Sequence, residues 1–352
     1  PIKSSAASDV YKRQVMDAMV IIRFMNLVCT FRQRYEKNIA RTRARGEAAH
    51  FFTIFLRFVR GYFYLCPAIV SSTRMKVFTN VRELRAELDR TEQSGIGFVP
   101  TMGALHAGHR SLVERARREN ATVVVSVFVN PTQFNDKNDL RNYPRTPEAD
   151  ERLLAEAGAD FVLMPSVEEI YPEPDTRVFD FGQVDKVMEG ATRPGHFNGV
   201  AQVVSRLFDI VRPARAYFGE KDFQQIAVIK AMVRQLALPV EIVECPIVRG
   251  EDGLALSSRN TLLDAAHRAA APHIYATLQH AVELSHELTP DRLKEWVVGE
   301  VERNPLLKVI YYQSVDALTM QEVASWSDSE RIQGCIAVQA GEIRLIDNIR
   351  IR

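Results

Sequence analysis

The chain has 352 residues, of which 46% are hydrophobic and 25% are charged, and its formal net charge is +1. These proportions are typical of a soluble globular protein of about two domains, and they exclude a low-complexity or multiply membrane-spanning chain. The four cysteines are Cys29, Cys66, Cys245 and Cys335, and no two have CxxC spacing. We therefore expect free thiols in a reducing cytoplasm, without a disulfide framework or a zinc cluster.

Residues 1–74 differ in kind from the rest of the chain. They contain 13 Lys and Arg against 4 Asp and Glu, a net charge of +9, whereas the remainder contains 32 against 40, a net charge of −8. Residues 9–14 read like a translated transposon end from library preparation, which favours an artefact or a leader. A targeting or surface-binding peptide and a real accessory segment are the alternatives. The apolar run 51–66 contains Arg57 and Arg60, so it is too short and too charged to span a membrane comfortably.

The first elements after the extension are an amphipathic helix over 81–91, a strand over 96–100 and a helix over 106–119. His106 and His109 fall where this strand passes into the helix N-terminus. Free backbone N–H groups and the helix dipole favour a phosphate there. A histidine in that place can hydrogen-bond a phosphate oxygen, or carry positive charge when it is protonated. A polar turn with two solvated histidines is the structural alternative.

Strands and helices continue to alternate through the middle of the chain. Strand-like runs occur at 122–129, 160–164, 214–218 and 240–245, and helical patterns at 147–157, 198–212 and 221–236. Thr146 and Pro147 supply an N-cap and a first helical residue, and Gly158 ends that helix. The pattern predicts an α/β domain over residues 75–255, a Rossmann-like parallel sheet with helices on both faces. Ligands of such sheets bind beyond the carboxyl ends of the strands. The residues expected there are His106, Asn130, Gly219 and Lys221.

Beyond residue 255 the pattern changes to two helices followed by strands. The helices are predicted at 264–287 and 290–303, and the strands at 307–315, 335–339 and 342–346. We expect a small α+β domain over residues 256–352 that closes over the first domain. It begins with the loop from Leu256 to Asn260, which contains two serines and an arginine. Hydroxyl donors beside a fixed positive charge suit a triphosphate whose charge grows during transfer.

Six motifs follow one another in this chain, at residues 100–106, 128–134, 143–146, 189–197, 218–225 and 256–260. Together they resemble the pantoate–β-alanine ligase family, within the HxGH nucleotidyltransferase superfamily that includes class I aminoacyl-tRNA synthetases. The resemblance covers residues 75–352. It implies an ATP-dependent ligase of the cytoplasm that makes pantothenate, a coenzyme A precursor. Pantoate would attack ATP to give pantoyl-adenylate and pyrophosphate, and β-alanine would then displace AMP.

The resemblance also implies roles for particular residues. The catalytic set would be His106, His109, Lys221 and Arg259, with His109 similar to the family's proton donor. ATP would be bound by Met102, Gly103, Ala104, Leu105, His106, Ala107, Gly108, His109, Gly219, Glu220, Lys221, Asp222, Val248, Leu256, Ser257, Ser258 and Arg259. Pantoate and β-alanine would contact Met102, Asn130, Gln133 and Gln225, and the two glutamine amides can both donate and accept hydrogen bonds.

The resemblance implies small-molecule substrates and a homodimer, without nucleic-acid or membrane partners. ATP chemistry in turn implies Mg²⁺, which usually bridges phosphates and keeps several waters, so its protein ligands stay unknown. Two other classes of function remain open. One is a different adenylate-forming nucleotidyltransferase, which would lack the pair Gln133 and Gln225. The other is a non-catalytic module whose basic extension binds nucleic acid or an anionic membrane.

Several of these residues also have purely structural interpretations. Lys221 and Asp222 could form an exposed ion pair, Gln133 could be a turn residue and Asn130 a strand-end cap. Glu189 and Arg193 could be a structural pair or could belong to the site. Three carboxylates could either assist magnesium or form a solvated helix start, namely Glu148, Asp150 and Glu151. His196 and His267 are expected to be structural.

Overall fold

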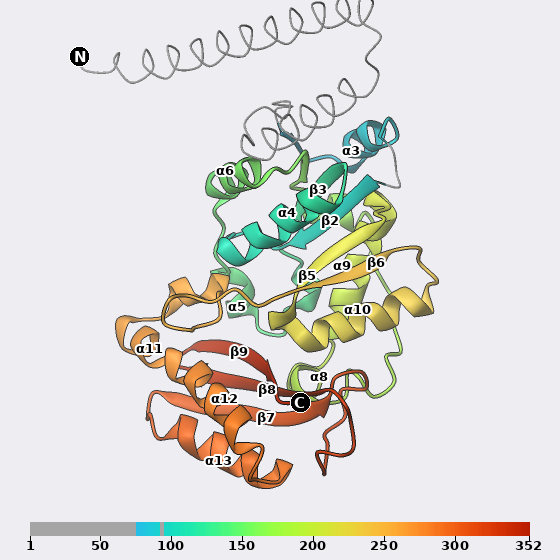
Figure 1. The fold of residues 1–352 in the computed structure, drawn as a ribbon. Coiled ribbons are helices and arrows are strands. Elements are labelled where there is room, and N and C mark those ends of the chain that lie inside the picture. The colour runs from blue at the N-terminus through green and yellow to red at the C-terminus, as the bar shows by residue number, and fades with distance from the viewer. Residues whose placement is uncertain (1–74, 92–94) are drawn as a thin grey trace, which may run out of the picture. The chain divides into compact units, whose positions relative to one another are not determined.

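The computed structural model describes residues 75–91 and 95–352, so the predictions made for residues 1–74, with Cys29 and Cys66, lie outside it. Residues 73–352 form one compact unit. Within it a six-stranded sheet with helices on both faces is followed by a three-stranded sheet with its own helices (Figure 1). No helix in the described part of the chain is long and apolar enough to cross a membrane.

The larger sheet is parallel throughout. Its strands are β1 (Lys76–Phe78), β2 (Ile96–Thr101), β3 (Thr122–Val127), β4 (Phe161–Leu163), β5 (Arg215–Gly219) and β6 (Glu241–Cys245). They lie in the order β1-β4-β3-β2-β5-β6, which confirms the predicted Rossmann-like sheet. From β2 the chain moves outward through β3 to β4, and it then crosses back to β5 and β6. The direction of winding therefore reverses between β2 and β5, and ligands of open α/β sheets bind at such a switch point.

Strands β2 and β5 part before they end. They pair at Gly97 with Arg215 and at Phe98 with Ala216, whereas the strands themselves run on to Thr101 and Gly219. On its other side β2 stays paired with β3 along its whole length. The divergence leaves room between the carboxyl ends of β2 and β5.

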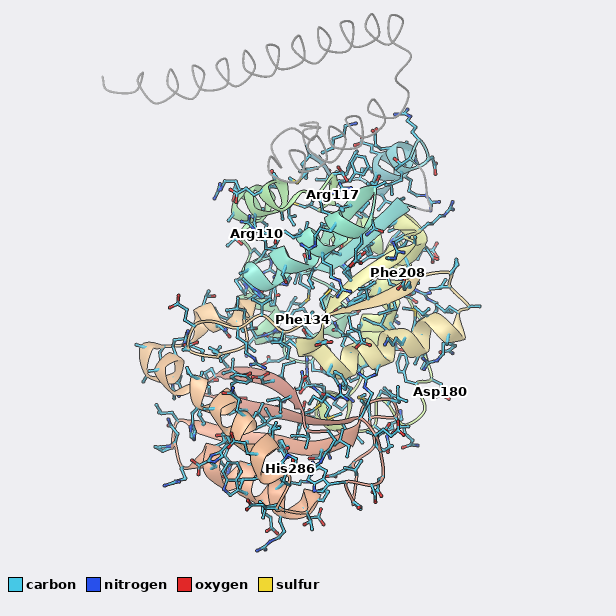
Figure 2. The ribbon with its side chains drawn as sticks, in the orientation of Figure 1. Arg110, Arg117, Phe134, Asp180, Phe208 and His286 are labelled. Atoms are coloured by element: carbon cyan, nitrogen blue, oxygen red, sulfur yellow. The ribbon has the colours of Figure 1, made fainter. Side chains whose placement is uncertain are left out.

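Alternate residues of the strands pack into separate apolar clusters on the two faces. On one face Phe98 and Phe218 lie with the helices α3 (Val81–Leu88), α9 (His196–Val211) and α10 (Phe223–Gln235). Phe98 meets Phe208 of α9, which Figure 2 labels, edge to face with ring centroids 6.2 Å apart. On the other face Val99 and Tyr217 lie with α4 (Ala107–Glu119) and α6 (Pro147–Ala157). The predicted helices on both faces are confirmed.

Several shorter elements were not predicted from the sequence. They are η3 (Pro131–Gln133), α5 (Lys137–Asn142), α7 (Val167–Ile170), α8 (Met188–Thr192), η4 (Glu220–Asp222) and η5 (Ser258–Leu262). Helix α6 has the predicted bounds and ends at Gly158, which has a φ of 91°. Thr146 occupies the predicted N-cap position and Pro147 begins the helix, but the Thr146 hydroxyl donates to Asp150 Oδ1 at 3.0 Å and accepts no capping hydrogen bond.

The C-terminal part contains α11 (Ala265–Ala270), α12 (Pro272–Leu284), α13 (Pro290–Glu302), β7 (Leu307–Asp316), β8 (Ile332–Ala340) and β9 (Ile343–Arg350). The strands form an antiparallel sheet in sequence order, and helices α12 and α13 pack on it around a separate apolar cluster. The prediction of one helix over 264–287 is wrong, because Pro272 lacks an N–H and begins a new helix. Both described cysteines, Cys245 and Cys335, are free and buried as predicted.

Candidate active site

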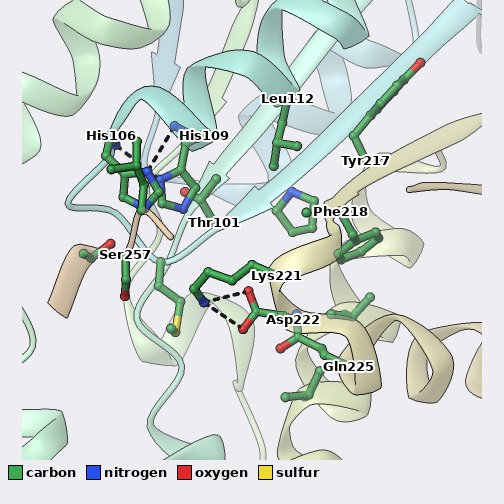
Figure 3. A pocket seen from close by; sticks show the side chains of 18 of the residues that line it. Thr101, His106, His109, Leu112, Tyr217, Phe218, Lys221, Asp222, Gln225 and Ser257 are labelled. Carbon is green, nitrogen blue, oxygen red and sulfur yellow. Dashed lines mark hydrogen bonds and ion pairs between the residues drawn. The ribbon is translucent and has the colours of Figure 1, made fainter. Parts of the chain in front are cut away.

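A cavity of about 210 Å³ opens at the carboxyl ends of β2 and β5 (Figure 3). Most of the predicted site residues line it, namely Met102, His106, Gly108, His109, Asn130, Gln133, Gly219, Lys221, Asp222, Gln225, Val248, Leu256, Ser257, Ser258 and Arg259. Five predicted residues do not, namely Gly103, Ala104, Leu105, Ala107 and Glu220. The two histidines come from the β2 side and Lys221 from the β5 side, so the switch point brings together motifs that are more than a hundred residues apart in sequence.

The two histidines are held by the backbone of their own turn. His106 is the N-cap of α4, and its Nδ1 accepts a hydrogen bond from the Gly108 N–H at 3.1 Å. His109 Nδ1 in turn accepts from the His106 N–H at 3.3 Å, and the ring centroids are 4.1 Å apart. Because each Nδ1 is an acceptor, each neutral ring carries its proton on Nε2. Each ring therefore offers one Nε2–H donor.

Burial keeps both imidazoles neutral. Burial, together with the nearby Lys221 ammonium, lowers the pKa of His106 to about 4. Burial, His106 and Lys221 together lower the pKa of His109 well below its usual value. At neutral pH the pair supplies hydrogen-bond donors without positive charge, and both rings line the cavity, which argues against two fully solvated turn residues.

A buried carboxylate orders the turn in front of the histidines. Asp150, from α6, is 2% exposed and accepts hydrogen bonds from the Ala104 N–H at 3.0 Å and the Leu105 N–H at 2.8 Å. Ala104 has a φ of 50°, in the left-handed region that a residue with a side chain seldom adopts. Its carbonyl accepts from Ser258 Oγ at 3.0 Å, which ties the Ser-Ser-Arg loop to the same turn. The interpretation of Asp150 as part of a solvated helix start is therefore wrong.

Two cations line the cavity, each with an acidic partner. Lys221 Nζ lies 3.3 Å from each Asp222 oxygen, and the Lys221 side chain is only 18% exposed, which argues against a simple surface ion pair. Arg259 donates two hydrogen bonds to the Asp139 carboxylate, from Nε to Oδ1 at 3.0 Å and from Nη2 to Oδ2 at 2.9 Å. Asp139 was not foreseen from the sequence, because it lies on the unpredicted helix α5.

The amide groups expected to bind the acid substrate meet beside Met102. Asn130 is 1% exposed, caps η3, and donates to Gln133 Oε1 at 3.1 Å and to the Gly199 carbonyl at 3.1 Å. Gln133 Nε2 faces only the Met102 sulfur, at 3.3 Å, among its described neighbours. A thioether is a weak acceptor, so this amide can still donate to a ligand. Asn130 therefore caps η3, in agreement with its structural interpretation, and its side chain also orients Gln133.

Other polar residues near the cavity have mainly structural partners. His196 Nδ1 lies 2.8 Å from the Gln133 carbonyl. Glu189 accepts from Arg193 at 3.4 Å and also from Tyr311 at 3.0 Å, and it pairs with Arg344, so it joins α8 to β7 and β9. These contacts favour the structural interpretation of Glu189.

The apolar wall of the cavity was missed from the sequence. It includes Val200, Val203, Val204 and Leu207 of α9, together with Pro246 and Ile247. Helix α9 is apolar on most of its faces, and that pattern signals burial without telling a cavity wall from a core.

The described residues contain no group of three or more His, Cys, Asp or Glu side chains that could hold a metal ion. The carboxylates nearest the cavity are engaged, Asp139 with Arg259 and Asp222 with Lys221. A Mg²⁺ ion that keeps its waters and binds through phosphate oxygens needs no dedicated protein cage. The donor set therefore fits a metal that arrives with a triphosphate.

Comparison with known proteins supports the same assignment. A family model described as pantoate-beta-alanine ligase matches residues 76–350. A pantothenate synthetase of Porphyromonas gingivalis is 58% identical over 278 residues, which are 78% of this chain and 99% of that protein. One of Bacteroides thetaiotaomicron is 56% identical over 280 residues, 79% of this chain and 99% of that protein.

Two solved structures extend the similarity to the fold. A pantothenate synthetase of Thermus thermophilus superposes with a TM-score of 0.75 at 47% identity, covering 79% of this chain and 99% of that one. A pantoate-beta-alanine ligase of Francisella tularensis, complexed with beta-gamma ATP and beta-alanine, gives 0.67 at 34% identity, covering 79% and 98%. The family predicted from the motifs is confirmed, and the chain belongs to the pantoate–β-alanine ligases.

Proposed function

We propose that this chain condenses pantoate with β-alanine to pantothenate at the expense of ATP, through pantoyl-adenylate. Its family membership over residues 76–350 carries the proposal. The lining of one cavity supports it as well. This cavity is lined by residues of the HxGH turn (residues 106–109), by Lys221 and by the Ser-Ser-Arg loop (residues 257–259). The Francisella relative, with an ATP analogue and β-alanine bound, supports the same two substrates here.

In the first step a pantoate carboxylate oxygen attacks the α-phosphorus of ATP. The bond from that phosphorus to the oxygen that bridges it to the β-phosphorus breaks, and pyrophosphate leaves with both electrons of the bond. The Nε2–H groups of His106 and His109 and the Lys221 ammonium stabilise the charge that develops on the phosphates. Arg259 exchanges Asp139 for the departing pyrophosphate, because a guanidinium fork fits either anion.

In the second step the free amine of β-alanine attacks the acyl carbon of pantoyl-adenylate. The C–O bond to the phosphate breaks, AMP leaves, and the nitrogen loses a proton to solvent as the amide forms. Gln133 and Gln225 hold pantoate through its hydroxyl and carboxyl oxygens. The apolar wall formed by α9 keeps water from hydrolysing the adenylate.

Magnesium enters this reaction as part of the substrate, bound to the ATP phosphates. It would neutralise part of the phosphate charge, beside the Lys221 ammonium and the Nε2–H donors of His106 and His109. The family resemblance further supports a homodimer that works in the cytoplasm without nucleic-acid or membrane partners.

The reaction is tested by its products. With ATP, Mg²⁺, pantoate and β-alanine, the protein should form pantothenate, AMP and pyrophosphate in equal amounts. Formation of ADP and phosphate instead would contradict the adenylate route. A panel of other carboxylic acids tests the alternative of a different adenylate-forming enzyme, which would turn over one of them faster than pantoate.

A further inference from the structure

The C-terminal domain reaches the active-site lysine through one buried side chain. Asn348 lies on β9 and is 3% exposed. Its Nδ2 donates to the Glu220 carbonyl at 2.9 Å and to the Lys221 carbonyl at 3.0 Å. One carboxamide thus holds two successive peptide groups of η4, the turn that carries Lys221.

The orientation of this carboxamide is fixed by its partners. Two carbonyls can only accept, so the nitrogen must face the turn and Oδ1 must face the other way. There Gln333 Nε2, from the neighbouring strand β8, donates to Asn348 Oδ1 at 2.7 Å. The preceding residue is held as well, because Arg249 forms a two-pronged pair with the Asp347 carboxylate, at 2.6 Å and 2.9 Å.

The turn that carries Lys221 connects a strand directly to a helix. It is a three-residue 3₁₀ segment between the end of β5 and the start of α10. Gly219 precedes it with a φ of −78°, and a Cβ there would meet nothing within 4 Å, so neither backbone strain nor lack of space requires a glycine. Gly219 is the last residue of β5 and pairs with Cys245 of β6, so the strand pairing ends where the turn begins. The two hydrogen bonds from Asn348 restrain the carbonyls directly after this pairing.

We propose that Asn348 is a positioning residue for Lys221, through which the C-terminal domain sets where the ammonium meets the ATP phosphates. The proposal rests on the proposed function, since it assumes that Lys221 acts on phosphate. A displacement of about 1 Å in a catalytic group can cost about 10²-fold in rate. Asn348→Ala should therefore lower kcat by about 10-fold or more, although Asn348 does not line the cavity.

A double-mutant cycle separates positioning from general stabilisation. We would measure kcat and the KM for ATP in pantothenate formation for the full chain, for Asn348→Ala, for Lys221→Ala and for the double variant. If Asn348 acts through Lys221, its replacement should change kcat less than about twofold once the lysine side chain is gone. Losses that multiply in the double variant would overturn the proposal, and so would full activity of Asn348→Ala or of Lys221→Ala.

A second variant protects the test against simple unfolding. Asn348→Leu keeps nearly the same side-chain volume but can neither donate nor accept, so both hydrogen bonds to the turn are lost while the buried space stays filled. We expect a similar loss of kcat with a melting temperature close to that of the parent chain. Unchanged kcat in this variant would count against the proposal.

The matched control is Gln321→Ala. Gln321 also donates from the C-terminal domain to a backbone carbonyl of the first domain, that of Gln183 at 3.3 Å, but it lies outside the cavity lining. It should keep the parent kcat, and a loss equal to that of Asn348→Ala would show that any contact between the domains matters equally. Absence of activity in the parent chain would instead refute the proposed function.

Discussion

The neutral state of the two histidines decides what each cavity group contributes. His106 and His109 supply aligned N–H donors, while Lys221 supplies a charge. Such donors act on the charge that develops in the transition state, because their orientation is already fixed by the backbone. In the proposed mechanism the lysine attracts ATP as well as its transition state, so its loss should also weaken ATP binding.

Replacing either type of group should therefore slow the chemical step. We predict that His109→Ala and Lys221→Ala each lower kcat by about 10²-fold or more, as for the loss of a preorganised electrostatic group. Lys221→Ala should in addition raise the KM for ATP. Lys230→Ala is the control, because Lys230 lies on α10 and pairs with Glu244 outside the cavity. Near-normal kcat in both site variants would break the assigned roles.

At the residue scale, the sequence predicted a site residue where a side chain suited to phosphate also lies in a recognisable motif. His109, Lys221 and Arg259 could be named because their side-chain types and their places after strands or in the Ser-Ser-Arg loop suit phosphate. Asp139 and Asn348 could not, since each acquires its role from a partner more than a hundred residues away. An Asp on a short helix and an Asn on a strand carry no signal by themselves.

At the scale of elements, the HxGH turn depends on a helix that follows it by some forty residues. Asp150 of α6 satisfies the backbone N–H groups of Ala104 and Leu105. Without this carboxylate the left-handed Ala104 would have no partner for its N–H, and an unsatisfied buried donor costs about 1–3 kcal/mol. Helix α6 thus supports the turn that carries His106 and His109, although the helix itself does not line the cavity.

We predict that Asp150→Asn lowers both stability and activity. The amide can accept with its oxygen only, so one of the two N–H groups loses its partner, and the free energy of unfolding should fall by about 1–3 kcal/mol. Chemical denaturation measures this change, and kcat should fall with it as the turn loosens. Glu148→Gln, at an exposed position in the first turn of the same helix, should change neither. Equal behaviour of the two variants would show that Asp150 does not order the turn.

The long elements were predictable and the short ones were not. Apolar periodicity over a full strand or helix revealed the alternation that builds the parallel sheet, within a few residues at most ends. Helices such as α5 and α8 have six and five residues, too few for a repeating pattern. Pro272 could have indicated the end of one helix and the start of the next, but the apolar pattern continues on both sides of the proline and favoured a single helix.

At the scale of the whole molecule, buried neutral histidines make folding sensitive to acid. Burial, with Arg193 nearby, lowers the pKa of His196 from 6.5 to about 4, and His106 behaves alike. Between these values the unfolded chain binds protons that the folded chain does not. The free energy of unfolding should therefore fall as the pH decreases from about 6.5 toward 4.

The variant His196→Asn isolates one of these contributions. An asparagine amide can still donate to the Gln133 carbonyl, as His196 Nδ1 does, but it does not titrate. Melting temperatures measured from pH 7.5 to pH 5 should decline less steeply for this variant than for the parent chain. Parallel curves would mean that His196 binds protons equally in the folded and unfolded states.

The central claim is that the cavity between β2 and β5 forms an acyl-adenylate from ATP and pantoate. It is tested most directly by the exchange of labelled pyrophosphate into ATP, with Mg²⁺ and without β-alanine. We predict exchange that requires pantoate and that Lys221→Ala strongly reduces. No exchange in a folded protein that binds ATP, or exchange indifferent to pantoate, would contradict the account.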